Sequence, residues 1–552
     1  MRTDPLNDLR AAVGSAVASV GGEPEAEGPA LERPPKPELG HYSTNAAMRL
    51  GSQLGEAPRT IAERLGAVLE TGLGPLADRV EVAGPGFLNL FLGDAWHRDA
   101  VKRILEADRF GAAAPRDPGV LLEFVSANPT GPLTAAGGRG AAFGDSLARV
   151  LDAAGHRVSR EYYLNDAGTQ IRNFARSIAA RMKGEEPPED GYSGAYVSEL
   201  ASELADAGAD PSDLDELARR GAEAMRIRIE ATLERFAVRF DTWSSERELL
   251  ERGELDATLE ALAAAGHTYE RDGALWLRTS AHGDDKDRVL IRSDGEPTYF
   301  ATDIAYHRDK LERGAELMID PLGADHHGYV PRMKAAIAAL GADPDRYEAP
   351  IMQLVNIVER GERTRMSKRK GEFVTLDELL DDIGPDAARF FLLQRSNDTA
   401  LDLDLELARS RSQENPVYYV QYAHARIASI LRKAAAEGAA ASDAAIAAAA
   451  AAAPARAAGC EPSEGALVRR LLELPEEVSI AAERRAPHRL TAYAMAVAAD
   501  FHAFYRDCRV VGADAEAGVD GLEAARIGVC LASKRVIARS LDLLGISAPE
   551  RM

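Results

Sequence analysis

The segment from Glu123 to Arg139 has the composition of a nucleotide-binding loop. An apolar run at residues 120–125 predicts a short buried strand, and the Asn-Pro-Thr-Gly-Pro sequence after it predicts a turn. Small, glycine-rich residues then open a predicted helix. In an open parallel sheet such a loop lies at the carboxyl edge, where glycine lets phosphate oxygens approach the amides of a helix N-terminus. On this segment alone, an ordinary turn between a strand and a helix is the competing interpretation.

A second polar loop contains Asp325, His326 and His327. It follows a predicted strand at residues 317–320 and precedes a predicted helix at residues 331–340, so it should lie at the same carboxyl edge as the first loop. Zinc is the competing interpretation. Two adjacent histidines do not easily point into one tetrahedral site, and no further histidine or cysteine is spaced to complete it. We therefore expect no zinc and no other metal held by the protein alone.

A third loop, residues 363–372, is the densest basic run in an acidic chain. Gly361 and Gly371 lie on either side of its basic residues, which favours a mobile loop over a helix face. Lys368 and its basic neighbours could then bind phosphate oxygens, whereas a solvated run of charges is the structural alternative.

The whole chain has the composition of a globular protein with several domains. Of its 552 residues, 46% are hydrophobic and 28% are charged, and the formal net charge is −22. That charge argues against a protein that coats nucleic acid nonspecifically, although local basic surfaces can still bind RNA. No apolar run suits a signal sequence or a membrane span, so we expect a soluble, cytoplasmic protein with no membrane partner. Three scattered cysteines argue against a disulfide framework.

The pattern of elements divides the chain into three parts. The first, residues 1–110, is predicted to be a small α/β domain that ends in a linker at residues 111–118. A helix is expected to begin at Ser43 or Thr44. The other expected elements are helices at residues 8–17 and 60–70 and strands at residues 80–82 and 87–92.

Residues 118–385 are predicted to form a Rossmann-type domain around a parallel sheet. The strand at residues 120–125, a helix at 138–153 and a strand at 156–164 have short links, which indicates a parallel βαβ unit. A helical insertion at about residues 168–270 interrupts the alternation. Strands of the sheet are expected to resume at residues 275–278, 289–292, 317–320 and 351–358.

Residues 386–552 are predicted to form an α-helical bundle. Within it, aromatic and cationic side chains occur together, as expected of a surface that stacks on unpaired RNA bases. These side chains are Tyr418, Tyr422, His424 and Arg426. Core packing is the competing interpretation. Residues 434–458 are nearly all alanine and are expected to form either a surface helix or a tether.

Seven stretches of the chain together resemble the class I aminoacyl-tRNA synthetases and, within them, the bacterial-type arginyl-tRNA synthetases. The resemblance covers nearly the whole chain. It implies an N-terminal domain that touches the tRNA elbow, a Rossmann catalytic domain with an insertion, and a C-terminal helical domain that binds the anticodon stem and loop. The seven stretches are residues 123–132, 161–168, 299–306, 323–329, 366–371, 417–426 and 543–552.

One departure from the family falls in the first loop. The family usually carries a His-x-Gly-His signature after Gly-Pro-Leu, whereas this chain has Thr134, Ala135, Ala136 and Gly137 there. Both imidazoles, which contact ATP phosphates in the family, are absent, and Thr134 could still donate one hydrogen bond. The second signature loop has Arg365 where many class I enzymes have lysine, which keeps the charge and changes its geometry.

The resemblance implies an arginine–tRNA ligase that charges its cognate tRNA through an ATP-dependent arginyl-adenylate, with Mg²⁺ accompanying the ATP. We expect a monomer that binds tRNA(Arg), L-arginine and ATP but no DNA, with the aromatic and cationic set above contacting the tRNA. The implied catalytic residues are Lys368, Ser367, Arg365 and Thr134; the implied arginine-binding residues are Glu123, Asn128, Tyr299 and Asp303; the implied ATP-binding residues are Pro132, Gly137, Gly138, Asp325, His326, His327, Met366 and Lys368.

Two other functions fit the same motifs. A catalytically weak paralogue could bind tRNA or arginine as a regulatory protein, but the intact Met366-Ser367-Lys368 sequence and the full set of RNA-binding domains weigh against it. An arginyl-transfer enzyme could keep the fold and use another acceptor. The two retained tRNA-contacting domains weigh against that alternative too.

Overall fold

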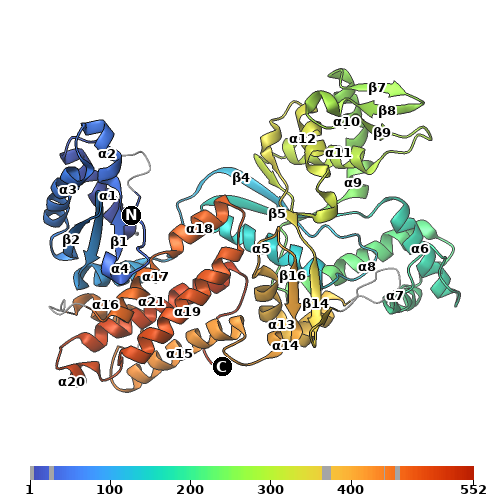
Figure 1. Cartoon of the computed structure of the whole chain (residues 1–552). Helices are drawn as coiled ribbons and strands as arrows, with labels where there is room; N and C mark the ends of the chain where they lie inside the picture. The colour runs from blue at the N-terminus through green and yellow to red at the C-terminus, as the bar shows by residue number, and fades with distance from the viewer. Residues whose placement is uncertain (1–4, 24–29, 364–373, 441, 454–459) are drawn as a thin grey trace.

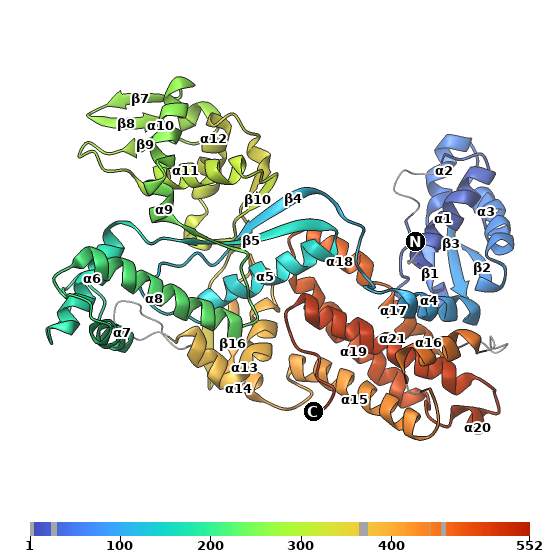
Figure 2. The same ribbon diagram turned by 180° about the vertical axis from the view of Figure 1, so that it is seen from behind.

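The chain folds into an N-terminal unit, a central α/β unit and a C-terminal helical unit (Figure 1). The structure is a computed structural model that describes residues 5–23, 30–363, 374–440, 442–453 and 460–552. The N-terminal unit packs on one end of the C-terminal helices, and the central unit adjoins the other end, as the view from behind also shows (Figure 2).

The N-terminal unit packs helices on a small antiparallel sheet. Its elements are α1 (Pro5–Ser19), β1 (Tyr42–Thr44), α2 (Ala46–Leu54), α3 (Pro58–Leu73), β2 (Ala77–Ala83), β3 (Phe87–Leu92) and α4 (Asp94–Glu106). The strand order is β1-β3-β2. The prediction of a helix start at Ser43 or Thr44 is wrong, because these residues belong to β1 and pair with Asn89 and Leu88 of β3. The helix begins at Ala46.

The central unit is built on a five-stranded parallel sheet. Its strands are β4 (Arg116–Glu123), β5 (His156–Leu164), β6 (Thr242–Ser245), β10 (Leu317–Ile319) and β12 (Tyr347–Glu348). They lie in the order β12-β10-β4-β5-β6, and every neighbouring pair is parallel. This is the Rossmann-type order, which places a topological switch point between β4 and β10. Helix α5 (Gly137–Ala153) connects β4 to β5.

Two insertions interrupt the sheet. The first, between β5 and β6, is helical and has its own core around Phe174, Ile178 and Leu200. The second, between β6 and β10, carries a separate antiparallel sheet in the order β7-β8-β9. The insertions comprise α6 (Gly168–Met182), α7 (Ala195–Asp206), α8 (Leu214–Arg235), α9 (Glu246–Glu251), α10 (Glu254–Ala264), β7 (Thr268–Arg271), β8 (Ala274–Leu277), β9 (Arg288–Ile291) and α11 (Tyr299–Glu312).

The sheet differs from the sequence prediction in two respects. The strands expected at residues 275–278 and 289–292 form as β8 and β9, but they belong to the separate antiparallel sheet. The third strand of the main sheet is β6, which lies inside the range 168–270 that was predicted to be a helical insertion. Because β6 has the sequence Thr-Trp-Ser-Ser and no apolar run, hydrophobic periodicity does not reveal it.

The rest of the central unit follows β10. The strand expected at residues 351–358 is interrupted, and its second half pairs with β16 rather than with the main sheet. The elements are β11 (Leu322–Gly323), α12 (Tyr329–Ala339), β13 (Ile351–Met352), β14 (Val355–Glu359), β15 (Glu362–Arg363), α13 (Leu376–Leu393), β16 (Leu401–Asp404) and α14 (Leu405–Arg409).

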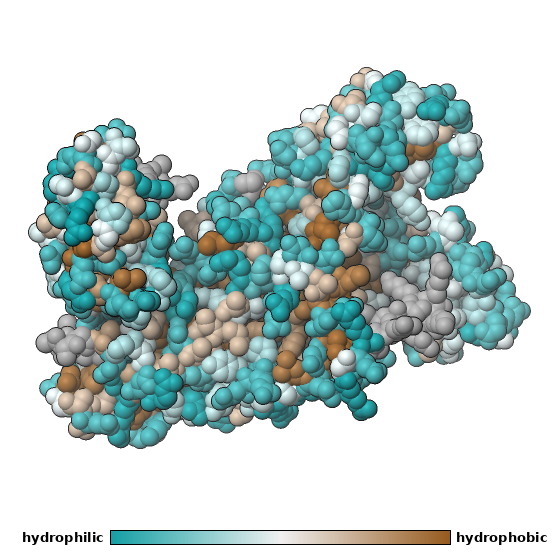
Figure 3. All heavy atoms as spheres, in the orientation of Figure 1, coloured by the Kyte–Doolittle hydropathy of each residue, from teal (hydrophilic) through white to brown (hydrophobic). Residues whose placement is uncertain are grey.

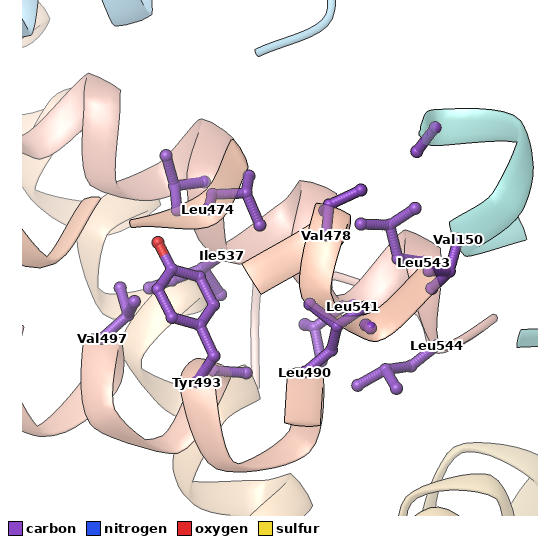
Figure 4. Close-up of a cluster of buried hydrophobic side chains, with 14 of the residues drawn as sticks. Val150, Leu474, Val478, Leu490, Tyr493, Val497, Ile537, Leu541, Leu543 and Leu544 are labelled. Carbon is purple, nitrogen blue, oxygen red and sulfur yellow. The ribbon is translucent and has the colours of Figure 1, made fainter. Parts of the chain in front are cut away.

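The C-terminal unit is helical, as predicted. Its helices are α15 (Pro416–Ala436), α16 (Asp443–Ala452), α17 (Pro462–Leu471), α18 (Leu474–Glu483), α19 (His488–Asp507), α20 (Ala513–Ala517) and α21 (Leu522–Leu543). In the core, apolar side chains of α18, α19 and α21 surround Tyr493 (Figure 4). The Tyr493 hydroxyl donates to the carbonyl groups of Arg470 and Leu471. Part of the alanine-rich tract forms α16, which packs against α4 and α21.

The surface drawn in Figure 3 is hydrophilic over most of the N-terminal unit and the sheet β7-β8-β9, and hydrophobic residues gather toward the middle of the molecule. Among the large hydrophobic side chains that the structure describes, Leu354 is the most exposed, at 71%. Within the described ranges, no helix combines the length and the apolar composition needed to cross a bilayer.

Arg389 of α13 joins several parts of the chain. It is fully buried, and its Nε and Nη1 donate to the carbonyl groups of Leu544 and Phe236 at 2.7 and 2.9 Å. Its Nη2 donates to the Asp145 carboxylate at 2.6 Å. Gly545, at a φ of +67°, closes over the guanidinium, since a Cβ there would lie 2.3 Å from Nη2. Arg389 therefore ties α5, the end of α8 and the C-terminal segment to α13.

We predict that Arg389→Met destabilises the chain by roughly 3–5 kcal/mol, because two buried carbonyl groups lose their donor and Asp145 loses a buried cation. Chemical denaturation followed by tryptophan fluorescence measures the change. Arg395, an exposed arginine six residues later, provides the matched control, and Arg395→Met should change the stability by less than about 0.5 kcal/mol. Equal stability of the two variants would contradict the role assigned to Arg389.

Candidate active site

The first loop leaves β4 at the switch point in a strained conformation. Val125 and Ser126 have φ angles of 70° and 39°, which non-glycine residues rarely adopt and which are least favourable for a β-branched residue. The Ser126 hydroxyl donates to the Glu123 carboxylate at 2.7 Å and accepts from the Tyr163 amide at 3.1 Å. These bonds hold the turn in place against β5, and such strain is characteristic of ligand sites.

The second half of this loop opens α5 and packs on α13. The Gly137 amide donates to Thr134 Oγ1 at 3.1 Å, so this hydroxyl satisfies one of the free amides at the start of the helix. Gly138 is buried, and a Cβ there would lie 2.9 Å from a methyl group of Leu376. Gly138 therefore allows α5 to approach α13 closely, whereas Gly137 faces more open space.

Glu123, at the end of β4, is paired with Lys310 of α11. The Lys310 ammonium donates to the Glu123 carboxylate at 2.5 Å and lies 3.1 Å from both carboxylate oxygens of Asp320. Burial alone would lower the pKa of Lys310, but Asp320 and Glu123 outweigh it and raise the pKa. His307 Nε2 lies 3.0 Å from Asp320 on the other side. A buried ion pair thus joins the ends of β4 and β10.

Two further buried carboxylates have cations of their own. Glu161 of β5 accepts from both terminal nitrogens of Arg313 at 2.8 Å and from the Tyr306 hydroxyl at 2.6 Å. Burial alone would raise the pKa of Glu161, but these donors lower it. Asp166 lies 3.4 Å from Arg247 and also accepts from the backbone amide of that residue.

Glu246 and Asp303 differ, because no lysine or arginine among the described residues forms a salt bridge with either. Glu246 begins α9 and is 6% exposed; burial, and then the charges of Asp303 and Asp166, raise its pKa to about 7. Asp303 of α11 accepts from the Tyr329 hydroxyl, and burial raises its pKa as well. Within the described chain, Glu246 Oε2 and the Tyr163 hydroxyl are buried without a hydrogen-bond partner.

Glu246, which is buried, and Asp303, which is half-buried, lie close enough for the charge of Asp303 to raise the pKa of Glu246. Such a pair would attract a positive group, and a planar guanidinium can donate to two carboxylates through separate N–H groups. Aromatic rings border the acids: Tyr163 stacks on Tyr306 with centroids 4.2 Å apart, and Phe300 meets Tyr329 edge to face. A cationic side chain can therefore lie between carboxylates and ring faces.

Other predicted substrate residues lie on α11 and on the first loop. Tyr299 is the first residue of α11, one turn before Asp303, and is 58% exposed. The Asn128 amide donates to Gln170 of α6 at 2.6 Å. Pro132 lines a cleft of about 400 Å³ between the first loop and α8.

The second polar loop is exposed beyond β11. Asp325 and His326 belong to the 3₁₀ helix η4 (Ala324–His326), His327 follows it, and all three side chains are exposed. His326 Nε2 lies 3.6 Å from the Asp325 carboxylate. Across the described residues, no group of three possible metal ligands occurs. Arg365, Met366, Ser367 and Lys368 of the third loop lie outside the described residues.

Three of the four residues expected to contact RNA, Tyr418, Tyr422 and Arg426, form a partly exposed surface on α15. The rings of Tyr418 and Tyr422 stack with planes 11° apart and centroids 6.1 Å apart. Arg426 donates to the Tyr422 hydroxyl at 2.6 Å and lies over the rings of Tyr422 and Tyr505 at 5.1 and 4.9 Å. Tyr505 of α19, 40% exposed, extends this aromatic and cationic surface, although the sequence prediction did not include it.

His424 does not belong to that surface. It is 2% exposed, and its Nδ1 lies 2.8 Å from the Pro549 carbonyl oxygen. The neighbouring Gln421 donates to the Ser547 carbonyl at 2.9 Å. His424 therefore helps to fix the C-terminal segment on α15, and a buried side chain in this position cannot stack on a base.

Sequence reasoning missed Glu246 and Lys310. Ser245, Glu246 and Glu248 have the pattern of an ordinary helix start, and Ser245 does cap α9 by accepting from the Glu248 amide. That pattern gives no indication that the Glu246 carboxylate is buried. For Lys310 the one available signal was its spacing: it follows Asp303 by seven residues and so lies on the same side of α11.

Comparisons with known proteins agree with this geometry. Family models match as the arginyl tRNA synthetase N terminal domain (residues 7–92), the tRNA synthetases class I (R) catalytic domain (209–411) and the DALR anticodon binding domain (420–552). The arginine–tRNA ligase of Shouchella clausii is 43% identical, over 99% of this chain and 98% of that one. That of Syntrophotalea carbinolica is 45% identical, over 95% and 94%. The solved arginyl-tRNA synthetase of Thermus thermophilus superposes with a TM-score of 0.73 at 25% identity, over 99% and 100%.

The Rossmann-type sheet, the helical C-terminal unit and the match to the class I catalytic-domain model identify a class I aminoacyl-tRNA synthetase. Two relatives more than 40% identical over nearly the full length narrow the class further. The chain belongs to the arginyl-tRNA synthetase family, as its sequence motifs predicted.

We predict that Glu246→Gln changes the pH dependence of stability. Burial disfavours the charged form of Glu246 in the folded state and raises its pKa from 4.5 to about 7. The folded state therefore binds the Glu246 proton more tightly than the unfolded state, and the wild type loses stability as pH rises from about 4.5 to 7. The variant lacks this loss. Without ligand, it should gain about 2–3 kcal/mol relative to wild type between pH 5 and 8. Denaturation at both pH values measures this; Glu248→Gln, exposed on the same helix, is the control, and an equal difference at both pH values would contradict the prediction.

Proposed function

We propose that this chain is an arginine–tRNA ligase. In the first step a carboxylate oxygen of L-arginine attacks the α-phosphorus of ATP, and pyrophosphate leaves. In the second step a ribose hydroxyl at the tRNA 3′ end attacks the arginyl carbonyl carbon, and AMP leaves. The observation that carries the proposal is the pair Glu246 and Asp303, two acids with raised pKa values that form no salt bridge among the described residues of a fold shared with the family's catalytic domain.

The guanidinium of the substrate supplies the missing charge in this proposal. Its planar fork donates to Glu246 and Asp303 together, whereas the ammonium of lysine is a point charge that leaves part of the acceptor set unpaired. Selection of arginine then needs no editing step, since buried polar groups left without partners already penalise other substrates. Tyr299 lies one turn from Asp303 on the guanidinium side, and Asn128 lies nearer the α-amino group.

Glu123 acts indirectly in this proposal. It shares the cation Lys310 with Asp320, and burial raises its pKa despite that cation, so it offers less negative charge to the guanidinium than a free carboxylate would. Its carboxylate instead accepts from Ser126 and holds the strained turn beside the substrate. In this proposal the acids have two different roles. Glu246 and Asp303 bind the arginine guanidinium, and Glu123 holds the conformation of the first loop.

ATP is proposed to lie between the carboxyl ends of β4 and β10, with Mg²⁺ on its phosphates. Pro132 and Gly137 border it on one side, and Asp325, His326 and His327 on the other. The missing imidazoles remove hydrogen bonds worth about 1.5–3 kcal/mol each. Thr134 accepts from Gly137 through its oxygen and keeps its O–H for a phosphate. The family resemblance assigns charge stabilisation on the leaving pyrophosphate to Lys368, with Arg365 and Ser367 beside it and Met366 against the nucleotide.

The tRNA is proposed to contact the α15 surface. Tyr418, Tyr422 and Tyr505 offer ring faces for unpaired bases, and Arg426 adds a cation that the two neighbouring rings already orient. This local surface reconciles RNA binding with the overall charge of −22.

Arginine charging tests the proposed function. The purified chain, given ATP, Mg²⁺, radiolabelled arginine and bacterial tRNA, should form acid-precipitable arginyl-tRNA. Lys368→Ala is the control, and its rate should fall by about 10²–10³-fold because a charge-stabilising group is lost. Charging by the wild type no faster than by Lys368→Ala would contradict the proposal.

A further inference from the structure

The helical insertion contacts the turn at residues 128–132 through Tyr196. This residue lies in the first turn of α7, and its hydroxyl donates to the Thr130 carbonyl at 2.8 Å. Thr130 is buried. The ring also covers Gly131, since a Cβ there would lie 3.0 Å from the Tyr196 hydroxyl oxygen. A side chain from outside the parallel sheet thus fixes the backbone in the middle of the first loop.

A second tyrosine holds the other end of the turn. The Tyr162 hydroxyl, from β5, donates to the Ala127 carbonyl at 2.9 Å and accepts from the Ala127 amide at 3.0 Å. Hydrogen bonds from Tyr162 of the sheet and Tyr196 of the insertion therefore hold the two ends of the turn. Between them, the Thr130 amide bonds only locally, to the Asn128 carbonyl at 2.8 Å.

We propose that Tyr196 is a positioning residue that sets the second half of the first loop for ATP. The inference rests on the proposed function. The loop runs from Glu123, at the end of β4, to Gly137, at the start of α5, and Thr130 lies between them. In a chain without the signature imidazoles, ATP binding depends on the loop backbone. A shift of that backbone should therefore weaken ATP binding directly.

The proposed arginine site depends less on Tyr196. Its guanidinium side, Glu246 and Asp303, lies on α9 and α11 in the second insertion. Asn128 belongs to the same turn as Thr130, but its side chain is held separately by Gln170 of α6 at 2.6 Å. Loss of the Tyr196 hydrogen bond should therefore weaken ATP binding more than arginine binding. A residue with only a structural role would weaken both ligands alike.

The test is Tyr196→Phe in the full-length chain, with equilibrium binding of ATP and of arginine measured by calorimetry beside charging kinetics. The variant keeps the ring and loses one hydrogen bond, so the Kd and KM for ATP should rise about three- to tenfold while those for arginine change less than twofold. Tyr192→Phe is the matched control: it belongs to the same insertion, packs on Phe174, and its hydroxyl donates to no described residue. It should bind both ligands as the wild type does.

Gly131→Ala supplies a second variant. Its methyl group would displace the Tyr196 hydroxyl and should reproduce the selective ATP defect. Unchanged ATP binding in Tyr196→Phe, equal losses for both ligands, or no ATP binding by the wild type would each overturn the positioning role. Failure of the proposed function would give a different result from failure of the positioning role, because the wild type would then bind ATP without charging tRNA.

Discussion

Charge balance among the acids at the carboxyl edge of the parallel sheet is the constraint on which this structure depends. Most of these acids have a cation within the chain, and a buried carboxylate without one costs several kcal/mol in its charged form. Glu246 and Asp303 form no salt bridge among the described residues, and burial raises the pKa of each. The free protein reduces this cost by raising their pKa values, and a cationic substrate removes it. Glu161 pairs with Arg313 and Asp166 with Arg247, whereas Glu123 and Asp320 share Lys310.

The second insertion supplies both acids without a salt bridge in the described chain and cations that pair with other acids. Between β6 and β10 the chain carries Glu246 on α9 and Asp303 on α11, and the same two helices carry the cations Arg247 and Lys310. The parallel sheet supplies the remaining acids at fixed strand ends. Lys310 bridges the ends of β4 and β10, and it lies on α11, the helix that also carries Asp303. The switch point is therefore joined to the proposed arginine site through one helix.

Much of this could be predicted from the sequence, for identifiable reasons. The β4 strand, its turn and α5 have apolar periodicity and distinctive turn residues, and the family motifs supplied the three-part architecture. The sequence did not predict β6, because its four polar or aromatic residues show no hydrophobic periodicity. β8 and β9 were assigned to the wrong sheet, because periodicity does not show which strands pair. Glu246 follows the cap residue Ser245 and so resembles an ordinary acid in the first turn of a helix. His424 lay among exposed aromatics in sequence, but whether a helical side chain faces solvent depends on what packs against it.

The proton balance of arginine binding tests the central claim most directly. A free-state pKa of about 7 for Glu246 means that a guanidinium entering the pocket must expel protons at neutral pH, about half a proton per arginine at pH 7. Calorimetric titration of arginine in two buffers of different ionisation enthalpy gives this number. The account predicts release by the wild type and its loss in Glu246→Gln. No release by the wild type, or equal release by both proteins, would contradict it.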